Sequence, residues 1–154
     1  MRVGVVVAAA IVRDGLLLAQ QRARPAELAG RWELPGGLAE RGEPDDAALI
    51  RECGEELGVL VRPGARLGPD VTLPGGRVLR AYAATLATRR GATGRDGRVE
   101  PRAVEHAALR WVSAEQLDEL DWLEADRVLL PALHELLGGQ ANGVRRPGPG
   151  GRRA

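Results

Sequence analysis

The chain has 154 residues, enough for one domain with a hydrophobic core of its own. Its formal net charge is +1, which excludes an overall electrostatic field of the kind that attracts nucleic acid or an anionic membrane. Its single cysteine, Cys53, cannot form an internal disulfide, so we expect a reducing, cytoplasmic setting. The apolar run at 3–12 is too short to span a bilayer and leads directly into a turn, so we expect no membrane association.

Apolar runs separated by turn residues predict a β-rich first half. Residues 3–12 are mostly alanine and β-branched side chains, which is typical of a fully buried strand. Asp14-Gly15 predicts a hairpin turn. We expect strands or extended segments at 3–12, 16–21, 32–34, 59–61, 71–73, 78–86 and 109–112. Residues 88–104 are rich in glycine and arginine without apolar periodicity, and we expect a mobile surface loop there.

The longest helix is expected between Pro44 and Gly58. Proline is tolerated at a helix start, two aspartates follow it in the first turn, and Gly58 can close the helix in the left-handed conformation. The apolar side chains cluster on one side of this helix, which we expect to be the buried face. They are Ala47, Ile50, Cys53 and Leu57.

Three glutamates of the same helix, Glu52, Glu55 and Glu56, lie at i, i+3 and i+4 in one narrow sector. Like charges at this spacing repel by roughly 0.2–0.5 kcal/mol per pair. A divalent cation would remove that cost, and carboxylate oxygens suit magnesium or manganese. The alternative is a solvated acidic face, which is what most charge runs on helices are. The glycine-rich turn at 35–37 is needed to choose between the two interpretations.

Two shorter helices are expected near the C-terminus. The Ser113–Gln116 segment has a capping-box pattern and predicts a helix to about Leu120. A broad apolar stripe predicts a last helix at 126–137. Residues 138–154 lack the apolar content to pack and predict a disordered basic tail, which leaves one folded domain at 1–137.

The segment 37–59 resembles the Nudix box, G-x5-E-x7-R-E-U-x-E-E-x-G-U, in which U is an aliphatic or apolar residue. The matching positions are Gly37, Glu43, Arg51, Glu52, Cys53, Glu55, Glu56, Gly58 and Val59. All seven fixed identities and both spacers agree, and a pattern of this length is far more specific than a lone glycine motif. Cys53 departs from the box because an aliphatic residue is usual at this position. The departure is small, since a buried thiol behaves as a small hydrophobic side chain. The resemblance implies the Nudix fold, an α+β protein built as an α/β/α sandwich with a mixed β-sheet.

The resemblance also implies a Mg²⁺-dependent hydrolase, with Mn²⁺ as the substitute ion, that cleaves a diphosphate linked to another group. The metal ligands that it implies are Glu52, Glu55, Glu56 and the backbone carbonyl of Gly36. Arg51 would hold a box carboxylate in orientation, and Glu43 would brace the loop against the helix. Metal ions can neutralise phosphate oxygens, orient an in-line attack and lower the pKa of bound water. Glu52, Glu55 and Arg51 are therefore candidate catalytic residues.

A further carboxylate is expected from outside the box. In the segment EHAALRW, Glu105 stands where MutT-type members of the family have an additional metal-binding or basic glutamate. Glu100 is the competing candidate. We expect His106 to be a surface or loop residue rather than a base, and His134 to be structural.

The substrate must be chosen by other residues, because the box does not fix it. The segment before the box resembles MutT-like nucleoside triphosphatases, in which Arg22 would contact the nucleotide and Leu34 would lie near the base. The segment LPGGRVLRAY is similar to the branch acting on CTP, dCTP and their 5-methyl derivatives. There Arg80 or Arg77 would contact phosphate or base.

Asp126 occupies the position at which an asparagine reads an oxidised guanine in the similar MutT-like segment. A carboxylate only accepts hydrogen bonds, which suits the N4 amino group of cytosine. It can also accept from guanine N1–H and N2–H₂, so oxidised dGTP stays open. Asp126 is equally a preferred residue for capping the last helix. Trp122, also a candidate for contact with substrate, fits a core or pocket-wall position better than a base-stacking platform.

We therefore expect a nucleoside triphosphate pyrophosphohydrolase that releases the monophosphate and pyrophosphate and sanitises the nucleotide pool. Cytidine triphosphates are expected first and 8-oxo-dGTP second. One alternative is a nucleoside-diphosphate-sugar or ADP-ribose hydrolase, and an alternative of another class is a non-catalytic nucleotide-binding regulator. The expected partner is the nucleotide, with no nucleic acid and no membrane, and the protein is expected to be a monomer or homodimer.

Overall fold

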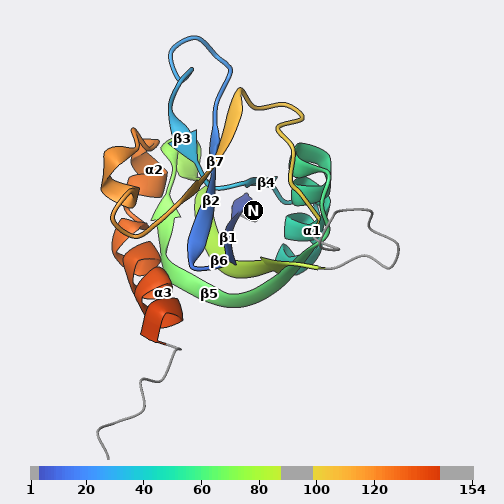
Figure 1. Ribbon diagram of the computed structural model, residues 1–154. Coiled ribbons are helices and arrows are strands. Elements are labelled where there is room, and N and C mark those ends of the chain that lie inside the picture. Colours follow the sequence, from blue (N-terminus) through green and yellow to red (C-terminus); the bar gives the residue numbers. More distant parts are fainter. Residues whose placement is uncertain (1–3, 88–98, 143–154) are drawn as a thin grey trace, which may run out of the picture.

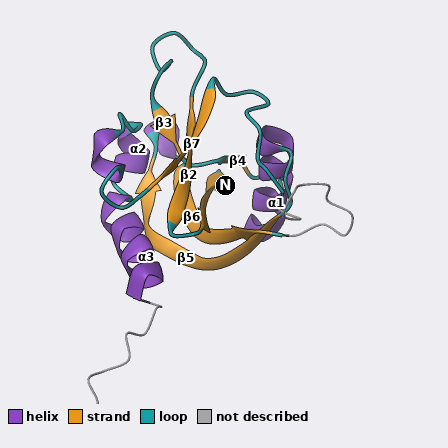
Figure 2. Ribbon diagram, viewed as in Figure 1, coloured by secondary structure: helices purple, strands orange, loops and turns teal. Residues whose placement is uncertain are grey.

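The computed structural model describes residues 4–87 and 99–142. A seven-stranded sheet runs through the molecule and carries helices on both faces (Figures 1 and 2). The strands are β1 (Val5–Arg13), β2 (Leu16–Gln21), β3 (Trp32–Glu33), β4 (Gly36–Leu38), β5 (Val61–Thr72), β6 (Val78–Leu86) and β7 (Ala108–Val112). The helices are α1 (Asp45–Leu57), α2 (Glu124–Arg127) and α3 (Leu130–Asn142), with the 3₁₀ turns η1 (Pro74–Gly76) and η2 (Leu117–Glu119). None of the described helices is long and apolar enough to cross a membrane.

Strand β1 lies at the centre of the sheet. The strand order is β3-β2-β1-β6-β5, while β4 pairs with β1 and β7 pairs with β2. The β1–β6 pair is parallel, whereas β1 is antiparallel to both β2 and β4. The expected mixed sheet of an α+β protein is therefore confirmed.

Side chains of β1 alternate between two cores, because successive residues of a strand point to opposite faces. Val7, Ala9 and Ile11 belong to one cluster, which includes the apolar face of α1. Ala8 and Ala10 belong to the other cluster, which includes α3 and the segment before it. One cluster lies on each face of the sheet, between the sheet and the helices that cover that face. The predicted α/β/α sandwich is therefore confirmed.

Helix α1 starts and ends as predicted but buries a different face. Its buried residues are Ala48, Leu49, Cys53, Glu56 and Leu57. The prediction that Ala47 and Ile50 lie on the buried face is wrong, since Ala47 is only partly buried and Ile50 is 38% exposed. The helix is rotated so that Glu56 faces the sheet. Hydrogen bonds to this carboxylate, described below, compensate its burial.

Strand β5 is one long edge strand where the sequence predicted two short segments. It follows β6 over its whole length, with register shifts between Pro63 and Arg66 and between Leu67 and Val71. Proline and glycine occur within this strand at 63–64 and 68–69. At a sheet edge they produce irregular pairing, because one side of the strand needs no partner.

The C-terminal region also departs from the prediction. The helix expected at 126–137 is split into α2 and α3, and α3 continues to Asn142, so the predicted start of the tail at 138 is too early. Residues 143–154 of that tail, and 88–98 of the predicted mobile loop, lie outside the described residues. The capping-box segment forms the 3₁₀ turn η2 rather than an α-helix, although the Ser113 N–H does donate to Gln116 Oε1 at 3.0 Å.

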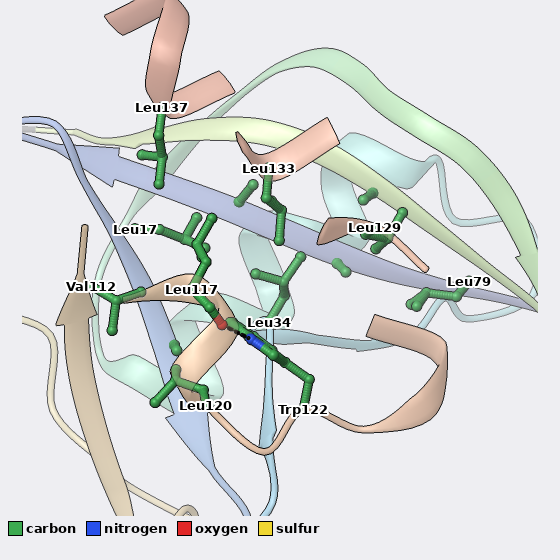
Figure 3. Packing of buried hydrophobic residues seen from close by; sticks show 14 of the residues in the cluster. Leu17, Leu34, Leu79, Val112, Leu117, Leu120, Trp122, Leu129, Leu133 and Leu137 are labelled. Carbon is green, nitrogen blue, oxygen red and sulfur yellow. Dashed lines mark hydrogen bonds between the residues drawn. The ribbon is translucent and has the colours of Figure 1, made fainter. Parts of the chain in front are cut away.

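Trp122 is a central residue of the core on the α3 side (Figure 3). Its side chain is fully buried, and its indole N–H donates to the Leu117 carbonyl at 2.7 Å. Leu34 and Leu133 lie in the same cluster. The structure thus gives Trp122 a packing role and places it away from solvent.

Replacing Trp122 with phenylalanine should lower the free energy of unfolding by about 1–3 kcal/mol, because the Leu117 carbonyl loses its donor. In a domain of this size that corresponds to a drop in Tm of roughly 3–10 °C, measurable by circular dichroism. Val128→Ala, at a side chain that is 51% exposed, is the control and should change Tm by no more than about 2 °C. A Trp122→Phe variant that melts with the parent protein would contradict the packing role.

Candidate active site

The turn before α1 brings the backbone unusually close to β1. Gly36 has a φ of 155°, and β4, which begins at this residue, pairs with β1. A Cβ placed on Gly36 would lie 1.9 Å from the Val7 carbonyl oxygen, so only glycine fits. The Gly36 N–H donates to Oε2 of Glu56 at 3.0 Å. The glycine therefore joins the turn to the helix.

Gly37 leaves room for a second carboxylate of the helix. A Cβ on Gly37 would lie 2.4 Å from the carboxyl carbon of Glu52, so the Glu52 side chain lies directly against the turn. Burial raises the pKa of Glu52, and Arg51 opposes that shift. The negative charges of Glu55 and Glu105 raise it further. Both carboxylates are therefore within electrostatic reach of Glu52.

Glu56 is the buried member of the acidic cluster, with an exposure of 8%. Its Oε2 accepts from the Gly36 N–H and from Nε2 of Gln20, each at 3.0 Å. Burial raises the pKa of Glu56 to about 7, although these two hydrogen bonds lower it. A carboxylate in this state gains more from a nearby cation than an exposed one does.

Arg51 ties the acidic residues of the box together. Its Nε and Nη2 donate to both carboxylate oxygens of Glu43, at 2.9 and 2.8 Å. Its Nη1 donates to Glu52 at 2.9 Å and to Glu55 at 3.5 Å. The hydrogen bond from Arg51 lowers the pKa of Glu43 to about 2. This network braces the loop against α1 and offsets the repulsion between the glutamates, which is the geometry that the predicted supporting roles of Arg51 and Glu43 require.

A cavity of about 310 Å³ opens beside the glycine turn. It is lined by Val6, Arg22, Ala23, Arg24, Glu33, Gly36, Gly37, Glu56, Glu105 and His106. The structure therefore brings together Arg22, Gly36, Glu56 and Glu105 from the predicted site residues, with Glu52 next to them against Gly37. Glu55 lies on the same helix but is 56% exposed.

The two candidates for the additional carboxylate are separated by the structure. Glu105 lines the cavity, and its segment is fixed on either side by backbone hydrogen bonds from Val104 N–H to the Glu56 carbonyl and from Ala107 N–H to the Gln21 carbonyl. Glu100 instead pairs with Arg13 at 3.1 Å and does not line the cavity. The geometry favours Glu105.

Glu33 and His106 belong to the cavity wall, although the sequence did not point to Glu33 and suggested a surface or loop position for His106. Glu33 Oε1 accepts from Arg22 Nη1 at 3.1 Å and lies 2.9 Å from His106 Nε2. His106 lies in the loop before β7, as one of the two expected alternatives, but its side chain is only 10% exposed and is therefore not a surface residue. The only sequence signal for Glu33 was its place beside Trp32 and Leu34, where alternation on a strand turns it away from the core.

Four of the five predicted substrate residues, all except Arg22, do not line the cavity. Leu34 and Trp122 are core residues, 4% and 0% exposed, and they lie in the same cluster (Figure 3). Arg80 forms a two-point ion pair with Asp70 and also donates to Asp45 at 3.1 Å. It therefore anchors the first turn of α1 to the sheet. Contacts of these side chains with a substrate would require the present packing to change.

Asp126 is buried and does not line the cavity. It is 5% exposed, and its Oδ1 accepts from the Leu34 N–H at 2.9 Å. The alternative that Asp126 only caps the last helix is wrong, because it lies inside α2, whose N-cap is Leu123. Burial raises the pKa of Asp126 to about 7, the Leu34 hydrogen bond lowers it, and the charge of Glu33 raises it.

The potential metal ligands beside the cavity are suited to a hard cation. The carboxylates of Glu52, Glu56 and Glu105 and the backbone of the 36–37 turn offer only oxygen atoms, which fit Mg²⁺ or Mn²⁺ better than softer ions. Within 4–87 and 99–142, no three His, Cys, Asp or Glu side chains converge tightly enough to form a metal cluster on their own. Arg51 supplies the compensating positive charge at the edge of this group.

A family model, the NUDIX domain, matches residues 1–133. The chain belongs to the Nudix family. Nudix hydrolases generally need divalent metal ions, which agrees with the oxygen donors of this site. The protein is therefore a hydrolase of this family.

Similar proteins and structures span most of this Nudix domain. A Mycobacterium tuberculosis protein provisionally named 8-oxo-dGTP diphosphatase 2 is 47% identical over 145 residues, covering 92% of this chain and 96% of that protein. The CTP pyrophosphohydrolase of Escherichia coli is 35% identical over 131 residues, covering 85% and 91%. The solution structure of the E. coli ORF135 protein is 33% identical with a TM-score of 0.69, covering 97% of this chain and 96% of that one. A MutT Nudix hydrolase of Burkholderia pseudomallei is 34% identical with a TM-score of 0.65, covering 86% and 98%.

Replacing Asp126 with asparagine should stabilise the protein at alkaline pH and not at acid pH. The folded-state pKa is about 7 and the ordinary value is 3.8, so between these values the folded protein keeps a proton that the unfolded chain has lost. The stability of the parent protein therefore falls as pH rises through this window. Asparagine cannot ionise but can still accept from the Leu34 N–H, so the variant should be roughly 2–4 kcal/mol more stable at pH 8.

Urea unfolding at pH 4 and pH 8 measures this difference, and the two proteins should agree within about 1 kcal/mol at pH 4. Asp121→Asn, at an exposed aspartate of the neighbouring segment, is the matched control. A stability difference that is the same at both pH values would contradict the raised pKa of Asp126.

Proposed function

We propose that this Nudix hydrolase is a Mg²⁺-dependent pyrophosphohydrolase that converts a nucleoside triphosphate to the monophosphate and pyrophosphate. The observation that carries the proposal is the cavity in which Glu56 and Glu105 meet the glycine turn, with Arg22 lining the same space. Carboxylates on this side can hold a cation, while an arginine can contact the phosphates or the nucleoside. The site thus offers both signs of charge to a polyanionic substrate.

We assign different roles in the hydrolysis to the residues in and beside the cavity. Glu52 and Glu56 would hold the metal with the turn carbonyl, and Arg51 would keep Glu52 in orientation. When bound, the ion would screen the phosphate charge and lower the pKa of a bound water. Glu105 is the carboxylate that we assign to accept a proton or to complete the coordination. Glu55 is more exposed and would join as an outer ligand.

The substrate that we propose is a cytidine triphosphate first and 8-oxo-dGTP second. Two relatives support a nucleotide of this kind, since one is named for 8-oxo-dGTP and the other for CTP. Within the site, carboxylates offer acceptors for the N4 amino group of cytosine. Glu33 lines the cavity, and Asp126 holds the backbone of the adjacent Leu34. Removal of damaged or modified nucleotides from the pool is the role that these substrates imply.

A pyrophosphate-release screen over nucleoside triphosphates with Mg²⁺ tests the reaction. The parent protein should release pyrophosphate from CTP, dCTP or 5-methyl-dCTP, and from 8-oxo-dGTP. Glu105→Gln should lower kcat by about 100-fold, because the amide cannot accept a proton and is a weaker metal ligand. Glu100→Gln removes a carboxylate that pairs with Arg13 outside the cavity and should change kcat by less than about twofold. Absence of release from every triphosphate would overturn the proposal.

Base choice is tested by the ratio of kcat/KM for CTP to that for 8-oxo-dGTP. Glu33→Gln should lower this ratio about tenfold, the cost expected when an amide replaces one acceptor oxygen opposite the cytosine amino group. Asp126→Asn is the companion variant, and it should change the ratio by less than about twofold because Asp126 does not line the cavity. An unchanged ratio in Glu33→Gln would contradict the role of Glu33, and a lower ratio in Asp126→Asn would assign base choice to Asp126.

A further inference from the structure

Gln20 is a polar side chain in an otherwise apolar strand. The residues before it on β2, Leu17, Leu18 and Ala19, are fully buried core residues, and Gln20 itself has 0% exposure. Its Nε2 donates to Glu56 Oε2 at 3.0 Å. Its own carbonyl oxygen, Oε1, is buried and has no hydrogen-bond partner among the described groups.

The burial of the Gln20 carbonyl oxygen without a partner makes the folded state less stable. A buried carbonyl without a donor loses its hydration and gains nothing in return. An apolar side chain of similar size at position 20 would avoid that loss and extend the core that Leu18 begins. The amide is therefore best explained by what it does for Glu56.

The hydrogen bonds to Glu56 are unevenly divided between its two oxygens. Gln20 Nε2 and the Gly36 N–H both donate to Oε2, one from β2 and the other from the glycine turn. Within the described residues no group donates to Oε1. Two donors on one oxygen fix the rotation of the carboxyl plane, because turning it would break both bonds. Since Glu56 lines the cavity, Oε1 is the oxygen left to a ligand.

We propose that Gln20 is a positioning residue that holds Glu56 with Oε1 directed at the divalent cation. The inference rests on the proposed function insofar as Glu56 is taken as a metal ligand. Residues that orient a metal ligand through a hydrogen bond commonly change metal affinity by 10- to 100-fold when removed. Gln20 lies outside the box and on another strand, so its contribution depends on the fold that brings β2 against α1.

The test is a double-mutant cycle read out by Mn²⁺ binding, measured by electron paramagnetic resonance in the absence of nucleotide. Gln20→Met keeps the length of the side chain and removes the donor, and it should weaken Mn²⁺ binding about tenfold. Glu56→Gln should weaken it at least as much. In the double variant Gln20→Met should cause no further loss, because its effect acts through Glu56. Gln21→Met is the matched control, since that amide donates to the Gly30 carbonyl, and its Mn²⁺ affinity should stay within about twofold of the parent's.

Each other outcome overturns the inference at a recognisable step. If Glu56→Gln loses Mn²⁺ affinity and Gln20→Met does not, Gln20 has no positioning role while the proposed metal site stands. If Gln20→Met weakens binding equally with and without the Glu56 carboxylate, its effect is a general structural one. If Glu56→Gln binds Mn²⁺ as tightly as the parent protein, Glu56 is not a ligand, and the metal assignment in the proposed function fails as well.

A second measurement uses the unaltered chain and does not depend on the variant folding. The side-chain amide of Gln20 gives a ¹⁵N–¹H NMR signal that should shift on titration with Mg²⁺, with the same midpoint as the Gly36 amide. Both groups donate to the same oxygen of Glu56, so both should sense the cation. A Gly36 signal that shifts while the Gln20 side-chain signal stays constant would overturn the inference.

Discussion

The close contact between the 36–37 turn and helix α1 is the constraint on which the rest of the site depends. Gly36 has no space for a side chain because the Val7 carbonyl lies where its Cβ would be, and a side chain on Gly37 would displace the Glu52 carboxylate. The absence of a side chain at position 36 lets the backbone pack against β1 and donate to Glu56. The hydrogen bond in turn makes it possible for a carboxylate to face the sheet. The rotation of α1, and with it the direction of its glutamates, follows from this contact.

The acidic residues of the box are kept in two different electrostatic states by their surroundings. Arg51 hydrogen-bonds Glu43 and lowers its pKa to about 2, whereas burial raises the pKa of Glu56 to about 7. One group is thus permanently charged and structural, while the other is held in an environment that a cation would relieve. The same segment therefore contains both the Arg51–Glu43 ion pair that braces the loop and the carboxylates that we assign to the metal. Because the ion pair between Arg51 and Glu43 already holds the loop, a cation that binds to the carboxylates need not rearrange the loop.

The box and the helix could be predicted from the sequence because their information is local. The spacing from Gly37 to Val59, the proline at the helix start and the glycine at its end are all read within one segment. Contacts between distant segments could not be read in this way. Ile50 was expected to be buried because the helix alone favours its apolar side, but the hydrogen bonds to Glu56 come from β2 and β4. Arg80 looked free for substrate, and only the fold brings Asp45 and Asp70 to it.

The same distinction explains why the reaction can be assigned more firmly than the substrate. The groups assigned to metal binding come from one continuous turn and helix, apart from Glu105, whose segment is hydrogen-bonded to the Glu56 carbonyl. The groups that we assign to the nucleoside come from the residue after β2, from β3 and from the segment before β7, and Glu33 contacts the other two. Arg22, Glu33 and His106 form one chain of contacts, so a change in any of them shifts the other two. In the function that we propose, substrate choice is therefore assigned to this chain of contacts rather than to a single residue, while the glycine turn fixes the carboxylates assigned to the chemistry.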